Sequence, residues 1–149
     1  MKILQLFTLC FFLVVGFQSF AQYTLKVKVY GIENTNGQIE LSVYNDAKVF
    51  PEVGKTYKMV RIDAKVGEIT YEFTNLPAGE YAIATFHDEN NDKECNTNLI
   101  GVPTEAFAFS NDFRPFLSAP DFSDCSFKVD KNMEISIEMV YWLTFYFQS

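Results

Sequence analysis

Apolar and polar residues alternate along several short segments of the chain, and this period of two is typical of half-buried β-strands. Between residues 23 and 32, Leu25, Val27 and Val29 alternate with more polar neighbours. The same alternation predicts further strands over residues 39–44, 59–64, 69–73, 81–86, 126–129 and 134–140. Turn residues separate these segments: Asn36-Gly37 follows the first strand, and Leu-Pro-Ala-Gly-Glu-Tyr spans residues 76–81. No segment has the period of an amphipathic helix.

The seven segments predict an all-β fold, an antiparallel seven-stranded Greek-key β-sandwich of the immunoglobulin-like kind. Residues 88–123 have no clear period and are predicted to form one long loop. A compact domain rarely keeps a loop of this length unless the loop is functional or held in place, so we expect function to reside there. The inner faces of the sheets should carry Leu25, Val27, Val29, Ile39, Leu41, Val43, Ile83, Ile135 and Ile137.

The N-terminal segment has the order of a secretory signal peptide. Lys2 is followed by an apolar run over residues 3–17 and then by Ser19-Phe20-Ala21. This order predicts a signal peptide over residues 1–21 with cleavage after Ala21, because small residues precede the cleavage site. A membrane anchor is the alternative, but the run is shorter than a spanning helix needs. We therefore expect one exported domain over residues 22–149, located in the periplasm, at the outer membrane or outside the cell, with no transmembrane segment.

Composition and charge narrow the function classes. Hydrophobic residues make up 48% of the chain and aromatic residues 17%, so a globular core is expected rather than disorder. The net charge of −7 argues against a nucleic-acid partner, because phosphate binding needs clustered Lys and Arg. The single His argues against most triad chemistry. The aromatic end, residues 141–147, is predicted either to extend the last strand or to form an exposed patch.

Two cysteines remain in the predicted mature chain, and two interpretations of them stay open. Cys95 and Cys125 are an even pair in a protein expected to enter an oxidising compartment, which favours a disulfide closing a loop of about 30 residues. The other interpretation is a pair of buried free thiols that pack as small apolar residues.

The start of the long loop carries side-chain oxygens at alternate positions, which is the spacing of a calcium loop. The candidate Ca²⁺ ligands are Asp88, Asn90, Asp92, the backbone carbonyl of Glu94, and Asn96. Lys93 occupies the position where a calcium loop has Gly, and Leu99 replaces the bidentate Glu of an EF-hand. The alternative is an Asx-rich loop whose side chains bind their own backbone.

Two segments resemble known families. Residues 73–83, Phe-Thr-Asn-Leu-Pro-Ala-Gly-Glu-Tyr-Ala-Ile, resemble the F-x-x-L-P-x-G-x-Y turn of transthyretin-like sandwich modules. From His87-Asp88 through residues 96–105, 109–111 and 119–122, the order of His, Asx, Gly and Pro residues is similar to the uncharacterised bacterial family called domain of unknown function 2141. This resemblance spans nearly all of the predicted mature chain. It implies a sandwich fold and export, and it implies no activity.

These observations favour a non-catalytic binding or structural module of the bacterial envelope, with a protein or glycan partner. The alternative is a small periplasmic hydrolase-type enzyme in which His87 acts with Asp88, Glu89 or Glu105 as acid and base. A ligand pocket formed by His87, Glu105 and Arg114 would serve either function. The sequence has no nucleophile motif, Gly-rich phosphate loop or metal cluster motif, which favours the binding module.

Overall fold

The computed structural model describes residues 21–99, 101–115 and 118–141. The predicted signal peptide lies outside the described residues except for Ala21, and so does the aromatic end except for Tyr141. The described residues form eight strands and two short helices. The strands are β1 (Gln22–Ile32), β2 (Gln38–Tyr44), β3 (Lys58–Asp63), β4 (Gly67–Pro77), β5 (Gly79–Asp88), β6 (Phe107–Phe109), β7 (Phe127–Val129) and β8 (Met133–Glu138). The helices are η1 (Ser110–Asp112) and α2 (Phe122–Cys125).

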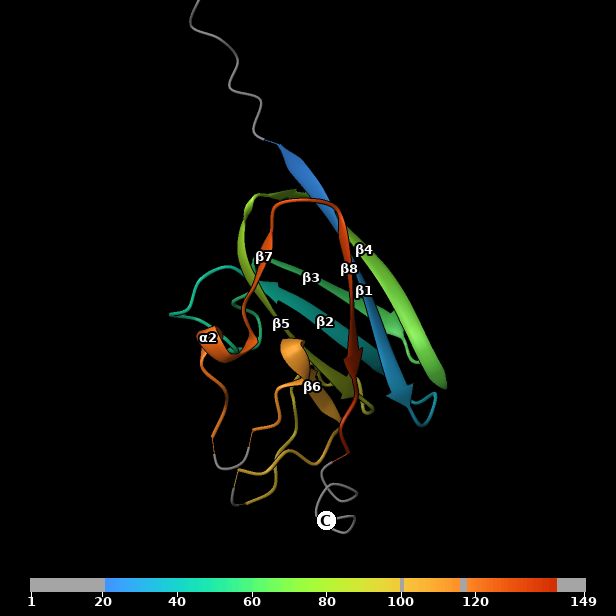
Figure 1. The fold of residues 1–149 in the computed structure, drawn as a ribbon. Coiled ribbons are helices and arrows are strands. Elements are labelled where there is room, and N and C mark those ends of the chain that lie inside the picture. Colours follow the sequence, from blue (N-terminus) through green and yellow to red (C-terminus); the bar gives the residue numbers. More distant parts are fainter. Residues whose placement is uncertain (1–20, 100, 116–117, 142–149) are drawn as a thin grey trace, which may run out of the picture.

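The strands form two sheets that pack on each other, so the prediction of an all-β sandwich is confirmed in outline. One sheet has the order β4-β1-β8, and the other has the order β3-β2-β5-β6, with β7 also paired to β5. Figure 1 shows the layer of β1, β4 and β8 lying across the layer of β2, β3 and β5. An isolated bridge between Phe107 and Val140 joins the two sheets at one corner. The structure describes no helix that is long and apolar enough to cross a membrane.

The core between the sheets contains the residues that alternation predicted. Eight of them are fully buried: Leu25, Val27, Val29, Ile39, Leu41, Val43, Ile83 and Ile137. Ile135 is half-buried and packs against the same cluster. Burial of each such aliphatic side chain contributes about 1.5–3 kcal/mol to folding, so this cluster is the main source of the sandwich's stability.

Two features of the predicted topology are wrong. The described residues contain eight strands rather than seven, and β8 runs parallel to β1, so the sandwich is not wholly antiparallel. Val27 lies opposite Ile135, and Val29 lies opposite Ile137, in this parallel pair. Alternation of side chains is the same in parallel and antiparallel strands, so the hydrophobic pattern contains no information about strand direction.

The segment over residues 88–123 is not the unstructured loop that was predicted. It contains β6 and η1, and α2 begins at its end. Ser110 holds the segment in place: its hydroxyl accepts the Ile83 N–H at 2.9 Å and donates to the Cys125 carbonyl at 2.6 Å. Strand β6 was missed because its three residues are all buried and therefore do not alternate.

The predicted turn at residues 76–81 is where the chain passes from one sheet to the other. Strand β4 ends at Pro77 in the first sheet, and β5 begins at Gly79 in the second. The Tyr81 hydroxyl donates a hydrogen bond to the Pro77 carbonyl at 2.9 Å. This bond ties the start of β5 back to the end of β4 and fixes the crossing.

Candidate functional site

A cleft lies on the face of the second sheet that points away from the core. Its floor comes from β2, β5 and β6, and its walls come from the loop after β2, from residues 101–103, and from Pro115, Ser118 and Ala119. The cleft has a volume of about 710 Å³, which is within the range of small-molecule sites. Figure 1 shows the segments that follow β5 and precede α2 passing below this sheet.

The cleft exists because both faces of this sheet are covered. In β2 and β5, the residues that alternate with the core positions are also mostly buried, including Tyr44, Ala82 and Phe86. These residues belong to a second apolar cluster, separate from the core between the sheets. A sheet covered on both faces needs apolar residues on both, and the nearly continuous apolar run of β5 meets that need.

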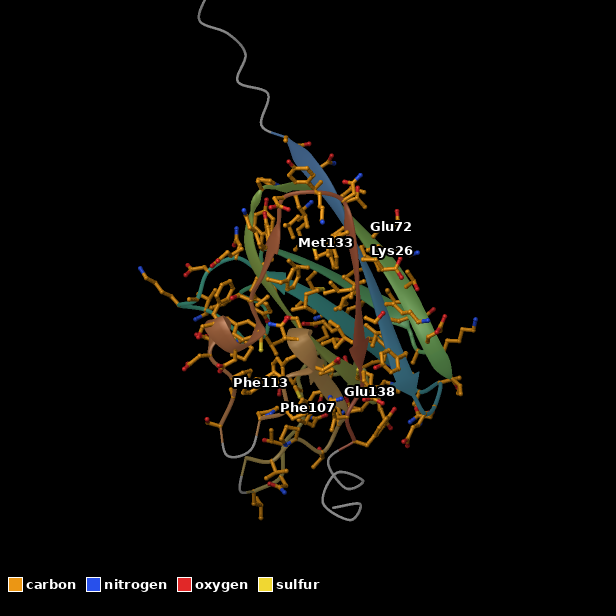
Figure 2. All side chains as sticks on the ribbon, viewed as in Figure 1. Lys26, Glu72, Phe107, Phe113, Met133 and Glu138 are labelled. Atoms are coloured by element: carbon orange, nitrogen blue, oxygen red, sulfur yellow. The ribbon has the colours of Figure 1, made fainter. Side chains whose placement is uncertain are left out.

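Aromatic residues and prolines line most of the cleft. The aromatic lining residues are Tyr44, Phe86, Phe107 and Phe109, and the prolines are Pro51, Pro103 and Pro115. The Tyr44 hydroxyl donates to the Glu52 carbonyl at 3.0 Å, and the Tyr44 ring meets Phe50 edge-on at 5.2 Å. These contacts hold the loop after β2 against the sheet. Figure 2 shows Phe107 in the lower part of the molecule, where the loops meet the sheets.

The floor of the cleft contains one buried carboxylate, that of Glu40. Glu40 is 1% exposed, and one of its carboxylate oxygens pairs with the Arg61 guanidinium at 2.5 Å. The other oxygen accepts the Ser42 hydroxyl at 3.1 Å. Arg61 lies directly opposite Glu40 in the β2–β3 register, which brings the two charges together. Arg61 is half-buried, so only the Glu40 member of this pair is fully removed from water. Desolvation of a carboxylate offsets much of the attraction in such a pair, and a perturbed buried charge at a cleft is a candidate functional group.

Cys95 lines the cleft but has no nucleophilic character. Burial, followed by the negative charges of Glu105 and Glu40, raises the pKa of the Cys95 thiol to about 12. Burial likewise raises the pKa of the Cys125 thiol to about 12. Both cysteines are free thiols in this structure and pack in the second apolar cluster. Both thiols are therefore protonated at neutral pH, which leaves them without the thiolate that attack requires.

The predicted calcium residues lie together in the loop that follows β5, residues 88–98, which we call the acidic loop. Asp88 is 1% exposed, and its two carboxylate oxygens accept the backbone N–H groups of Asp92 at 3.1 Å and Lys93 at 2.9 Å. The Asp92 carboxylate accepts the side-chain amides of Asn90 at 2.9 Å and Asn96 at 2.8 Å. These bonds are those of the Asx-rich loop that was the alternative prediction.

Asp92 and Glu105 are affected in opposite ways by their surroundings. The hydrogen bond from Asn96, with further bonds from the Glu94 N–H and Asn90, holds the pKa of the Asp92 carboxyl below its usual range. Glu105 closes the loop, because its two oxygens accept the backbone N–H groups of Glu89 and Asn96, each at 3.0 Å. Burial nevertheless raises the pKa of the Glu105 carboxyl, and the nearby Asp88 and Asp92 charges act in the same direction.

Residues 27–136 match the model of a family described as an uncharacterised protein conserved in bacteria, DUF2141. The chain belongs to this family. The match confirms the resemblance found in the sequence, and it includes both the cleft floor and the acidic loop. No curated protein and no solved structure matches the chain significantly.

In this DUF2141 chain, each residue of the predicted pocket, His87, Glu105 and Arg114, has a structural partner. His87 is 0% exposed; its Nε2 lies 2.6 Å from the Asn36 carbonyl and therefore carries the proton that is donated to it. Arg114 pairs with Glu138 of β8 at 2.9 Å, and Glu105 is engaged in closing the acidic loop. None of the three lines the cleft. No three His, Cys, Asp or Glu side chains within the described ranges are grouped so that they could hold a metal ion.

Sequence reasoning missed Glu40 and Ser42 of the cleft, and Arg61, which pairs with Glu40. Glu40 and Ser42 alternate with core residues, so they had the pattern of an ordinary solvent-facing side of a strand. One signal was present: Tyr44 on the same side of β2, and Ala84 and Phe86 of β5, are apolar at positions that alternation assigned to solvent. That pattern is typical of a strand with a second covered face.

Proposed function

We propose that this protein is an exported, non-catalytic binding module of the bacterial envelope, and that the cleft is its ligand site. The observation that carries the proposal is the cleft of about 710 Å³, with apolar walls and one buried, hydrogen-bonded carboxylate in its floor. Apolar side chains that line an open cleft face water, and apolar surface gathered in a concave site is typical of ligand-binding grooves. A purely structural module would gain stability by covering this surface. Export is supported by the order of Lys2, the apolar run and Ser19-Phe20-Ala21.

The geometry supports binding over the hydrolase-type alternative. The His87 side chain is fully buried, and the carboxylates of Asp88 and Glu105 are occupied by backbone N–H groups. Each of the three groups has a structural partner, and a general base must instead reach the proton that it removes.

The lining of the cleft also limits the chemical class of the ligand. Aromatic, proline and aliphatic residues predominate, and few polar groups are available. A glycan carries many hydroxyls that would lose their water without gaining partners there. An apolar small molecule fits the lining better. The sandwich that presents the cleft is proposed to be transthyretin-like, and the F-x-x-L-P-x-G-x-Y pattern of residues 73–83 supports this proposal.

The proposal is tested with a neutral apolar dye, Nile red. Its fluorescence should rise and shift to the blue when the wild-type protein is added. Ala84 lines the cleft, so Ala84→Phe should fill part of the space and weaken dye binding about tenfold or more. Ser136 is exposed on β8, and Ser136→Phe is the matched control that should leave binding unchanged. Equal binding by both variants, or no binding by the wild type, would contradict the proposal.

We also propose that Ca²⁺ braces the loop over residues 88–98. The observation in favour is the backbone of Lys93, whose φ of +69° is the left-handed conformation that a calcium loop requires at this position. The amide nitrogens of Asn90 and Asn96 both donate to the Asp92 carboxylate, so rotation of the two amides would bring their oxygens to the same point as the carboxylate, where an ion could bind.

A further inference from the structure

We propose that the cleft selects an apolar molecule with a primary ammonium head, and that the head binds at Glu40. This inference rests on the proposed binding function of the cleft and names its ligand class. Two polar side chains of the floor, Glu40 and Ser42, carry the argument.

The hydroxyl hydrogen of Ser42 is already used, because Ser42 donates it to the Glu40 carboxylate at 3.1 Å. The Ser42 oxygen can still accept a hydrogen bond. The side chains of Ser42 and Glu40 therefore present acceptors to the cleft and no donor.

The Glu40 carboxylate also has unused acceptor capacity. A carboxylate offers about four lone-pair directions, and Arg61 and Ser42 occupy two of them. The side chain of Glu40 is 2% exposed, so water does not freely supply the missing donors. A buried acceptor of this kind favours a ligand that brings donors, and an ammonium brings three.

The charge of the site selects a cation in preference to an anion. The negative charges of Glu40 and Glu105 help to raise the pKa of the Cys95 thiol in the cleft, and the charge of Glu40 helps to raise the pKa of the Tyr44 hydroxyl. The whole chain has a net charge of −7, which attracts cations in solution. A ligand carboxylate would face Glu40 in a low-dielectric setting, and Arg61, the nearby cation, does not line the cleft, so apolar acids should be rejected.

The remaining space suits an apolar body. Apart from the polar residues of the floor, the lining is mainly aromatic, proline and aliphatic. Burial of an alkyl chain against such a surface stabilises the complex in proportion to the apolar area removed from water. The ligand is therefore amphiphilic, with its head at β2 and its body between the loops.

Three probes with the same eight-carbon chain test the inference: octylamine, 1-octanol and octanoate. Titration calorimetry of the wild-type protein at neutral pH should rank octylamine first, octanol second and octanoate last, with about tenfold or more between amine and acid. If octanoate binds as tightly as octylamine, the ammonium inference is overturned while the binding function stands. If none of the probes binds, the proposed function itself fails.

Two variants locate the head group. Glu40→Gln should weaken octylamine binding about tenfold or more and leave octanol nearly unchanged. Arg61→Gln removes the competing cation and should strengthen octylamine binding, and octylamine should raise its melting temperature by more than it raises that of the wild type. If Glu40→Gln does not fold, the ranking of the probes on the wild-type protein and the Arg61→Gln result still test whether the ammonium head binds at Glu40. Unchanged amine affinity in both variants would overturn the assignment of the head to Glu40.

Discussion

The ionised carboxylate of Asp92 helps to hold the acidic loop. Its carboxylate accepts hydrogen bonds from Asn96, Glu94 and Asn90, and these bonds lower its pKa from the usual 3.8. Because the folded pKa lies below the unfolded one, ionised Asp92 stabilises the fold at pH values above 3.8, and this contribution is lost as the pH falls through the folded pKa.

The first prediction concerns the pH dependence of this stabilisation. Asp92→Asn should lower the urea midpoint at neutral pH, and the difference from the wild type should shrink as the pH is lowered below 3.8. Urea unfolding of both proteins at several pH values measures this difference. A difference that stays constant over the whole acidic range would show that the Asp92 charge has no part in holding the loop.

The second prediction concerns the affinity of the acidic loop for Ca²⁺ and the effect of Lys93 on it. Lys93→Gly removes both the strain of a left-handed φ and a positive charge beside the proposed ion, so Ca²⁺ should bind more tightly to the variant. At a Kd near 1 mM and about 10 mM Ca²⁺, the stabilisation is roughly 1.4 kcal/mol, or a few degrees in melting temperature. Mg²⁺ should do less, because it demands octahedral geometry and gives up water reluctantly. If neither protein responds to Ca²⁺ in a thermal melt, the loop is held by its Asx bonds alone.

At the scale of elements, the crossing between β4 and β5 decides how the two sheets meet. Tyr81→Phe removes only the hydroxyl that donates to the Pro77 carbonyl, and should lower the free energy of unfolding by about 1 kcal/mol. Tyr71→Phe is the control, because Tyr71 is exposed on β4. Equal unfolding midpoints for the two variants in urea would show that the Tyr81 bond does not stabilise the crossing.

Alternation of residues predicted seven strands close to their observed bounds, because each has one apolar face on the common core. The same reasoning could not find β6, whose residues are all buried, or the parallel direction of β8. It placed the acidic loop correctly, because Asx side chains at alternate positions form hydrogen bonds with the backbone of their own segment. It missed the cleft because Glu40 and Arg61 meet across two strands and the covering loops have no period.

At the scale of the whole molecule, a single core holds the two sheets together. Val27 is 0% exposed at the centre of β1, between β4 and β8. Val27→Asp would bury a charge without a partner and should lower the free energy of unfolding by several kcal/mol. Thr70→Asp on the exposed side of β4 is the control and should change stability by about 0.5 kcal/mol or less. An unchanged melting temperature for Val27→Asp would contradict the sandwich core.

The opposite face of the β4-β1-β8 sheet is polar and is not expected to bind an apolar ligand. Lys26 pairs with Glu134 at 3.0 Å, and Lys28 pairs with Glu68 at 2.5 Å, on this face. Figure 2 shows Lys26 and Glu72 beside each other on β1 and β4, where their register places them opposite one another. The molecule therefore has one charged face and one face with an apolar cleft, and this difference provides an internal control for any binding experiment.

The most direct test of the binding function is an octylamine titration followed in amide nitrogen–proton NMR spectra of the uniformly labelled protein. The account predicts saturable shifts at the cleft residues Glu40, Ala84 and Phe107, with little change at Lys26 and Lys28 on the charged face. Shifts confined to the charged face, or no saturable shift at the cleft, would contradict the claim that this cleft is the ligand site.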